Sequence, residues 1–395
     1  MPDSDARSGG RTTPRATGER RAEAPSTRGQ ANAPVGPTTA SGTPAVRSSR
    51  IPTMQDIARA SGVSQSTVSR VLTGAPTVVP INPATRERVL EVARQLRYRP
   101  NPLARGLRGA RTMLLGVIVR EITDPFFAGA VDAISSEANR RGYNVVLGHA
   151  HGKTDEAIAL RAVLETRHCD AILLLGDTSD QPRLLEDLRD TNITVVGLWQ
   201  GSAPVRGIFT VSVDNRAGVE ALLGHLLGLG HKRLAFIGGG FGEGLLLGDI
   251  GERRAAFLDL MAAAGLPVND GYIREIKNNL SGGATAFESL MKLPVRPTAI
   301  LASTDLLAIG AIHSAGRMGM TVPGDISIVG FDDLPMAEYT NPALTTVRQP
   351  MAAMAAVGVG AAIDNNGGEE APEVKLLVPS LIVRESSGPP PSDAR

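Results

Sequence analysis

The alternation of hydrophobic and polar positions divides the chain into parts with different periods. Over residues 51–98, apolar residues recur at helical spacing and are interrupted twice by turn-forming residues. Thr53 and Asp56 form a capping-box pattern at the start of a first helix, and Ser64 and Asn82 can cap a second and a third. These positions predict three short helices in a small domain over residues 51–98.

The pattern changes within residues 112–386, where short apolar runs alternate with helical segments. The runs are 113–119, 144–148, 171–175, 194–198, 234–238, 298–302 and 326–330. Strands that alternate with helices predict βαβ units and parallel sheets. The segment is long enough for two such halves, so we expect an α/β core behind the small helical domain.

The two ends and the connection between the parts have the composition of unfolded chain. Residues 1–50 lack Leu, Phe, Tyr and Trp, and we expect a disordered basic tail that either adds non-specific DNA contact or is an inert extension. Residues 387–395, rich in Pro and Ser, are expected to be a disordered C-terminus. Residues 99–111 form a linker in which Asn101 can start one short helix that Gly106 weakens.

Charge is distributed unevenly along the chain, whose formal net charge is only +1. Residues 1–50 carry +4 and residues 51–110 carry +6, which leaves −9 for the rest. A basic front and an acidic body favour a polyanionic partner such as DNA. The chain has no apolar run long enough to span a membrane, no apolar signal segment and a single cysteine, so we expect a cytoplasmic protein without a membrane partner.

Residues 53–72 carry the most specific motif, a helix-turn-helix. Gly62 permits the tight turn, and the second helix presents Gln65, Ser66 and Arg70 outward. Gln pairs bidentately with adenine and Arg with guanine in the major groove, while backbone N–H groups near Ser64 suit a phosphate. The motif therefore predicts that this domain reads double-stranded DNA.

The motif resembles the opening of the lac repressor (LacI/GalR) family. The segments Asp-Ile-Ala, Gly-Val-Ser and Thr-Val-Ser-Arg-Val-Leu carry the resemblance. It implies that the two variable residues after the cap, here Gln65 and Ser66, set the operator preference and that Arg70 reads a base. The DNA-contacting set that we expect in this domain is Thr53, Ser64, Gln65, Ser66, Thr67, Ser69 and Arg70. For Thr67 and Ser69, capping, packing or phosphate contact is the favoured alternative.

The same resemblance gives the linker a function. The family uses a hinge helix that inserts a leucine into the minor groove and bends the DNA. Leu107 matches that leucine, Ala104 matches the small residue beside it, and Asn101 begins the segment. By itself the composition fits an ordinary flexible linker equally well.

Six segments downstream resemble the effector-binding core of the family: 122–127, 213–218, 230–239, 304–310, 324–333 and 341–350. The resemblance implies a core similar to periplasmic binding proteins, with two Rossmann-like subdomains joined by three crossovers over residues 112–386. It also implies a cleft at the carboxyl ends of both sheets, which is where open α/β sheets bind ligands.

Candidate effector residues follow from these matches. Asp124, Arg253 and Asp305 match polar ligand contacts of the family, and Phe126 and Phe127 follow in the same segment as Asp124. Two carboxylates with one guanidinium suit a polyol, so we expect a sugar. Each of Asp124, Arg253 and Asp305 could instead be a helix cap or part of a surface pair, and Asp124 before Pro125 could simply cap the next helix.

Trp199, the only tryptophan, is the sixth candidate effector residue and a departure from the family pattern. It stands where relatives often have Asp, and Leu280 stands where many have an aromatic residue. Trp199 could supply the face on which a sugar stacks, or it could pack at a subunit or subdomain contact. These departures leave the identity of the effector open.

Other motifs add no cofactor, metal or catalytic site. The run from Gly238 to Gly244 lacks the phosphate-binding pattern, so we expect a flexible loop beside the cleft. His149, His151 and His168 with Cys169 lack metal-ligand spacing, and we expect Cys169 to pack beside a strand. With neither a catalytic constellation nor the export signal of a transport protein, the sequence predicts a homodimeric transcription repressor, controlled by a sugar and bound to a near-palindromic operator.

Overall fold

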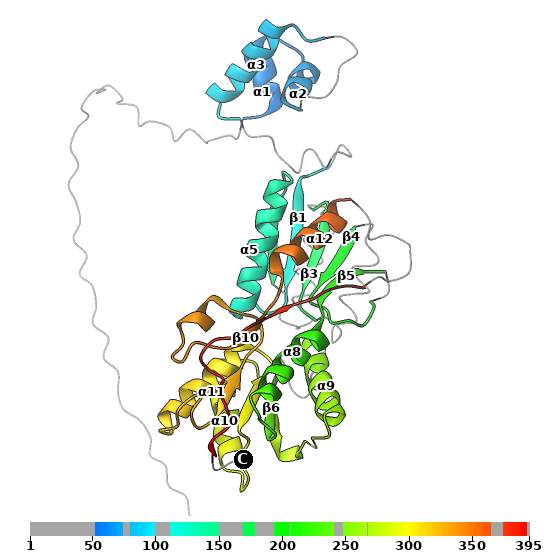
Figure 1. Cartoon of the computed structure of the whole chain (residues 1–395). Helices are drawn as coiled ribbons and strands as arrows, with labels where there is room; N and C mark the ends of the chain where they lie inside the picture. Colours follow the sequence, from blue (N-terminus) through cyan, green and yellow to red (C-terminus); the bar gives the residue numbers. More distant parts are fainter. Residues whose placement is uncertain are drawn as a thin grey trace, which may run out of the picture. The chain divides into compact units, whose positions relative to one another are not determined.

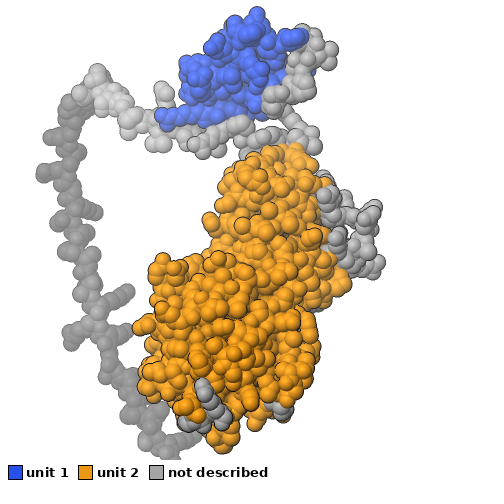
Figure 2. All heavy atoms as spheres, viewed as in Figure 1, with its two compact units in different colours: residues 1–98 blue, residues 99–395 orange. Residues whose placement is uncertain are grey.

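The chain divides into two compact units, residues 1–98 and 99–395 (Figure 2). The computed structural model describes residues 52–73, 80–98, 111–149, 169–177, 193–205, 207–240, 248–266, 268–364 and 374–392. The predicted tail over 1–50 and the hinge positions Asn101, Ala104 and Leu107 lie outside these residues. Each unit is built from its own hydrophobic core.

The first unit holds three helices, as the sequence predicts: α1 (Met54–Ser61), α2 (Gln65–Thr73) and α3 (Pro83–Gln95). The capping box at α1 is confirmed, because Asp56 N donates to Thr53 Oγ1 at 3.3 Å and Thr53 N donates to Asp56 Oδ2 at 2.9 Å. Gly62 ends α1 with a φ of 67°, a conformation that favours glycine.

Apolar side chains from all three helices form the core of this unit. Ile57, Val68 and Val89 are fully buried, one from each helix. Their burial fixes which face of α2 points inward and so leaves the opposite face to solvent.

The second unit contains two α/β subdomains (Figure 1). The first is a six-stranded parallel sheet in the order β11-β5-β4-β3-β1-β2. Its strands are β1 (Leu114–Val119), β2 (Asn144–His149), β3 (Ala171–Leu175), β4 (Thr194–Leu198), β5 (Phe209–Val213) and β11 (Val374–Leu377). Helices α5 (Pro125–Arg140) and α12 (Met351–Ile363) pack against each other and contribute to the core on one face of this sheet.

The second subdomain is a four-stranded parallel sheet in the order β7-β6-β8-β9. Its strands are β6 (Leu234–Gly240), β7 (Ile273–Lys277), β8 (Ala299–Ala302) and β9 (Ser327–Val329). Its helices are α8 (Asn215–Gly228), α9 (Gly248–Ala263), α10 (Leu280–Met291) and α11 (Asp305–Arg317), with short 3-10 helices at Asp270–Tyr272 and Pro335–Tyr339. Along β6, Leu234 and Phe236 face the core with α8 and α9, whereas Ala235 and Ile237 face the core with α10 and α11. Helices therefore cover both faces.

The chain passes between the two subdomains three times. The passages lie between β5 and α8, between β10 (Thr346–Arg348) and α12, and between β11 and β12 (Ser380–Ile382). Strands β10 and β12 pair in an antiparallel two-stranded sheet. Segments far apart in the sequence consequently meet at the junction of the subdomains.

The expected loop from Gly238 to Gly244 is wrong for its first three residues, which are the end of β6. At Gly239 an added Cβ would lie 2.8 Å from the Cβ of Asn278 and 2.9 Å from Leu307 Cδ1. The glycine is therefore explained by close packing within the sheet and against α11. Residues 241–247 lie outside the described part of the chain.

The expected disorder of residues 387–395 is wrong for the six of them that the structure describes. His231 Nε2 lies 2.8 Å from the carbonyl oxygen of Gly388, and Pro390 is buried. The composition indicated an unfolded end, but hydrogen bonds to a buried histidine and packing of a rigid proline hold it on the second subdomain. Residues 393–395 lie outside the description.

This attachment predicts a dependence of stability on pH. His231 is fully buried between Thr298 and the C-terminal segment, and burial lowers the pKa of its imidazole. As pH falls below about 6.5, the His231 imidazole is therefore protonated first in the unfolded chain, and the folded protein loses stability. Each unit by which the pKa in the folded protein lies below that in the unfolded chain lowers the free energy of unfolding by about 1.4 kcal/mol. Urea unfolding at several pH values between 5 and 8, followed by Trp199 fluorescence, measures this loss.

Buried carboxyls with a raised pKa change the free energy of unfolding in the opposite direction as pH falls. A comparison of variants therefore isolates the contribution of His231. His231→Gln is expected to lose part of the pH dependence, whereas His313→Gln, at an exposed position on α11, is expected to keep it. Equal pH dependence in the wild type and His231→Gln would contradict the assignment.

Candidate DNA-binding surface and effector site

The solvent-facing side of α2 carries the residues that we expect to read DNA. Gln65, Ser66 and Arg70 are exposed, while Val68 and Val71 on the opposite side are buried. Side chains that leave a short helix in one direction can enter a groove together. The structure thus places the three expected base-reading residues on one face.

The hydroxyl residues near this face have contacts within the protein. Ser64 Oγ accepts a hydrogen bond from Thr67 N at 3.1 Å and lies 2.8 Å from both Ser66 Oγ and Thr67 Oγ1. Thr53 Oγ1 donates to Asp56 Oδ2 at 2.7 Å. Thr67 and Ser69 are half-buried. Capping is therefore the observed role of Thr53 and Ser64, and their contacts with DNA stay a prediction.

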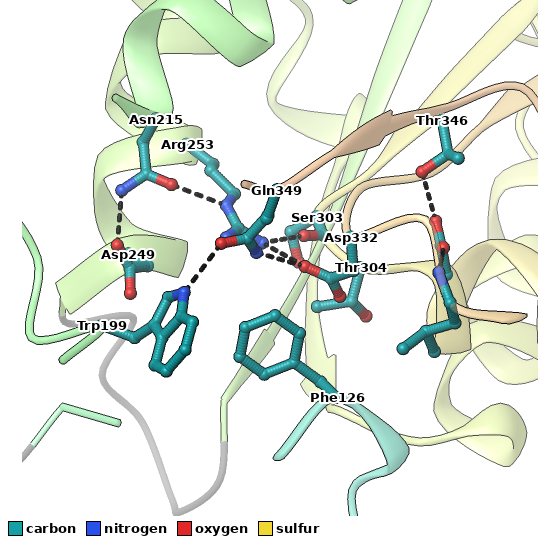
Figure 3. Close-up of polar contacts among 12 residues, drawn as sticks. Phe126, Trp199, Asn215, Asp249, Arg253, Ser303, Thr304, Asp332, Thr346 and Gln349 are labelled. Carbon is teal, nitrogen blue, oxygen red and sulfur yellow. Dashed lines mark hydrogen bonds and ion pairs between the residues drawn. The ribbon is translucent and has the colours of Figure 1, made fainter. Parts of the chain in front are cut away.

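Arg253 of α9 lies at the centre of the polar residues where the two subdomains meet (Figure 3). Its side chain is 4% exposed. Nε donates to Asn215 Oδ1 at 2.9 Å, and Nη1 donates to the carbonyl oxygen of Ser303 at 2.6 Å and lies 3.5 Å from Asp332 Oδ1. The guanidinium also lies over the Phe331 ring, 3.7 Å from its centroid. This buried cation is held from several directions at once.

Trp199 is connected to the same network through a crossover residue. Its Nε1 donates to Gln349 Oε1 at 3.0 Å, and Gln349 Nε2 donates to Asp332 Oδ1 at 2.7 Å. The indole packs edge-on against Phe126, with the ring centroids 5.4 Å apart, and Phe126 packs in the same way against Phe127 at 5.2 Å. Trp199 is 2% exposed, so the indole packs at the subdomain junction, and ligand stacking stays a prediction.

Asp124 caps a helix and also links the two subdomains, and its contact with an effector stays a prediction. Its Oδ1 accepts from Phe126 N at 2.9 Å and caps α5, which confirms the capping alternative. Its Oδ2 accepts from Asn278 Nδ2 at 3.1 Å, which joins the first subdomain to the residue after β7 in the second. Burial raises the pKa of Asp124, against the capping bond that lowers it.

Asp305 is more completely enclosed than the sequence suggested. Its Oδ1 accepts from Thr346 Oγ1 at 2.5 Å and its Oδ2 accepts from Leu334 N at 2.7 Å. It is fully buried, and burial raises its pKa to about 7. The observed role of Asp305 is to connect the segments that follow β8 and β9 to β10, and its contact with an effector stays a prediction.

Sequence reasoning missed several polar residues around Arg253. They are Asn215, Asp249, Ser303, Asp332 and Gln349. Three of them, Asn215, Asp332 and Gln349, lie in segments that carry the family resemblance, so a reading of those segments could have found them. Burial raises the pKa of Asp332 well above its ordinary value and also raises that of Asp249, while Arg253 acts against both shifts.

Comparisons with known proteins match both parts of the chain. Residues 53–101 match the family described as bacterial regulatory proteins, lacI family, and residues 223–387 match the periplasmic binding protein-like domain. Catabolite control protein A of Priestia megaterium is 33% identical over 307 residues, which are 78% of this chain and 90% of that protein. The chain belongs to the LacI family. It is therefore a DNA-binding transcription regulator and not an enzyme.

Further relatives agree with this LacI-family membership. The transcriptional repressor CytR of Escherichia coli K12 is 33% identical over 299 residues, which cover 75% of this chain and 85% of CytR. A lac repressor dimer bound to operator and the anti-inducer ONPF superposes with a TM-score of 0.75 at 26% identity, covering 86% of this chain and 100% of that one. A complex of the regulator CelR with cellobiose superposes with a TM-score of 0.62 at 28% identity, covering 85% of this chain and 99% of that one. The predicted fold class is confirmed.

Two further observations concern the described residues of this LacI-family chain. None of their helices is both long and apolar enough to cross a membrane. Cys169 is buried just before β3, with its sulfur against Gly116 of β1, which confirms that it packs beside a strand. Burial raises the pKa of its thiol to about 11.

Proposed function

We propose that this LacI-family regulator represses transcription by binding a near-palindromic operator as a homodimer. The observation that carries the proposal is the exposed face of α2, where Gln65, Ser66 and Arg70 project from one side of the helix. One such helix reads only a half-site, so a two-fold dimer reads two half-sites in opposite orientation. Such a regulator acts where the chromosome is, and we place it in the cytoplasm.

The linker supplies the second DNA contact in this proposal. Asn101, Ala104 and Leu107 lie outside the described residues, and their assignment rests on the resemblance of the segment to the family hinge. Leu107 enters the minor groove between base pairs, and the bend that it causes permits further contacts.

The junction around Arg253 is the proposed effector site. Polar and aromatic residues from both subdomains converge there, among them Asp124 and Trp199 from the first and Arg253 from the second. An effector bound at such a junction changes the angle between subdomains and thereby the spacing of two hinges, with a coupling of about 1–3 kcal/mol. The related CelR structure contains cellobiose, and we propose a sugar here.

Selection from random DNA duplexes tests the proposed operator binding. Purified full-length chain is incubated with a random library at physiological salt, and bound duplexes are amplified and sequenced over several rounds. We expect an enriched motif with two inverted half-sites about one helical turn apart. Enrichment of a single asymmetric half-site would contradict the dimer, and no enriched motif would contradict sequence-specific binding.

A further inference from the structure

The two subdomains of the core meet through glycine backbones at one point of their junction. Gly201 follows β4 in the first subdomain, and Gly248 begins α9 in the second. A Cβ added at Gly201 would lie 3.1 Å from the Cα of Gly248, and a Cβ added at Gly248 would lie 2.7 Å from the Cβ of Asp177, which follows β3. A side chain at Gly248 would therefore require the two subdomains to move apart.

Glu252 joins the subdomains at the same point, one helical turn into α9. Its Oε1 accepts hydrogen bonds from the backbone N and from the Oγ of Ser202, the latter at 2.7 Å. Its Oε2 accepts from Asn215 Nδ2 at 2.7 Å, which fixes the direction of the carboxylate. Hydrogen bonds to a carboxylate are stronger than those between neutral groups, so Glu252 secures the loop after β4 against α9.

Apolar side chains also connect the subdomains at this junction. Leu306 at the start of α11 and Leu334 after β9 belong to the second subdomain by their place in the chain. Both are buried, and they lie in the same hydrophobic cluster as Phe126 and Trp199 of the first subdomain. Opening the junction would expose part of this cluster to water, which is unfavourable.

The glycine contact and the Glu252 bonds lie away from the three crossovers. Gly201 and Asp177 follow β4 and β3, whereas the chain passes between the subdomains after β5, β10 and β11. In the sheet, β4 and β3 come after β5 on the side away from β11. The crossovers keep the subdomains joined at any angle, so the non-covalent contacts beside them are the ones that an opening motion breaks.

We infer that the contacts of residues 201–202 with residues 248–252 form a latch, made by the chain's own residues, that holds the two core subdomains closed and sets how readily they open. The inference deepens the proposed function, because the angle between the subdomains is what the proposed effector changes. An effector that opens the subdomains must break the latch, and one that closes them is assisted by it.

A buried thiol measures how often the subdomains open. The background chain carries Cys169→Ala and Leu306→Cys, which leaves one thiol, placed in the closed junction. Its reaction with an excess of a chromogenic disulfide reagent is timed in the full-length chain, without effector or DNA. When opening and closing are faster than the reaction, the rate is proportional to the open population.

Each latch variant has a matched control on the same helix. Gly248→Ala is compared with Gly265→Ala, because both glycines have positive φ, 55° and 69°, but a Cβ added at Gly265 would meet nothing within 4 Å. The two substitutions share the backbone strain and differ in the clash across the junction. Glu252→Ala is compared with Asp259→Ala, where the carboxylate is exposed and pairs with Arg216 at 3.4 Å.

We expect the labelling rate to rise about tenfold in Glu252→Ala, since the loss of hydrogen bonds to a charged group shifts an equilibrium by at least about this factor. Gly248→Ala is expected to raise the rate at least as much. Glu252→Gln keeps an acceptor oxygen and is expected to lie between Glu252→Ala and the background. Both controls are expected to react at the background rate, and a melting curve followed by Trp199 fluorescence confirms that each variant is folded.

Three results would overturn the inference: a thiol that reacts in the folded background chain as fast as in urea, an unchanged rate in Gly248→Ala or in Glu252→Ala, or an equal rise in the matched controls. None of these depends on DNA or on an effector. Failure of the operator selection would instead overturn the proposed DNA-binding function and leave the latch standing.

Discussion

Replacing Arg253 by methionine is expected to lower the free energy of unfolding of the core by about 3–5 kcal/mol, the range for removing one partner of a buried ion pair. The substitution leaves the Ser303 carbonyl and the Asn215 amide oxygen without their arginine donor, and it removes the cation beside the buried Asp332, which keeps only its hydrogen bond from Gln349. It also removes the cation that lies over Phe331. Methionine fills much of the same space, so the loss measures the missing charge and hydrogen bonds more than a cavity.

Urea unfolding followed by Trp199 fluorescence measures this change. Arg216→Met is the control, because Arg216 on α8 pairs with Asp259 at 3.4 Å while its side chain is 56% exposed. An exposed pair contributes less than about 1 kcal/mol. If Arg253→Met loses no more than the control, Asp332 is uncharged in the folded protein and Arg253 does not hold an ionised carboxylate.

Replacing Arg70 by alanine is expected to weaken operator binding by about 2–6 kcal/mol, since the proposed dimer would lose two base contacts that are each worth about 1–3 kcal/mol. Arg70 is exposed on the proposed reading face of α2, so its removal leaves the apolar core of the helical unit intact. The measurement is fluorescence anisotropy with the selected operator and with a scrambled duplex at equal salt.

The ratio of the two affinities distinguishes base reading from simple loss of charge. Arg59→Ala is the matched control, because the Arg59 side chain on α1 is 77% exposed and its substitution removes the same charge from the same unit. Arg59→Ala is expected to weaken both duplexes similarly, whereas Arg70→Ala should weaken the operator far more. Unchanged discrimination in Arg70→Ala would refute its assignment as a base-reading residue.

Predictions that rest on short-range patterns are confirmed where the structure describes them. Thr53, Ser64 and Asn82 cap the three helices of the first unit through bonds to residues two or three positions away. Strands buried on both faces, such as β3, give continuous apolar runs and are therefore visible in the sequence. The order of neighbouring residues alone determines the cap bonds and the apolar runs.

Two edge strands, β7 and β11, were not visible in this way, although the apolar runs of the edge strands β2 and β9 were. β7 reads Ile-Arg-Glu-Ile-Lys and β11 reads Val-Lys-Leu-Leu, with mixed exposure along each. Both lie at the edge of a parallel sheet, where one side of the strand has no neighbour and polar residues are tolerated. Their pairing depends on strands that are distant in the sequence, so composition did not reveal them.

The sequence by itself determined the helix-turn-helix, the exposed face of its second helix and the alternating order of the core, because caps, helical spacing and buried strands are local properties. Only the tertiary structure decided how the residues of the proposed effector site are connected. Trp199 meets Gln349 across 150 positions, and Asp124 meets Asn278 across 154. The enclosure of Asp305, the hydrogen bond between Asn215 and Asp249 and the attachment of the C-terminal segment likewise depend on three crossings between subdomains, which no local pattern specifies.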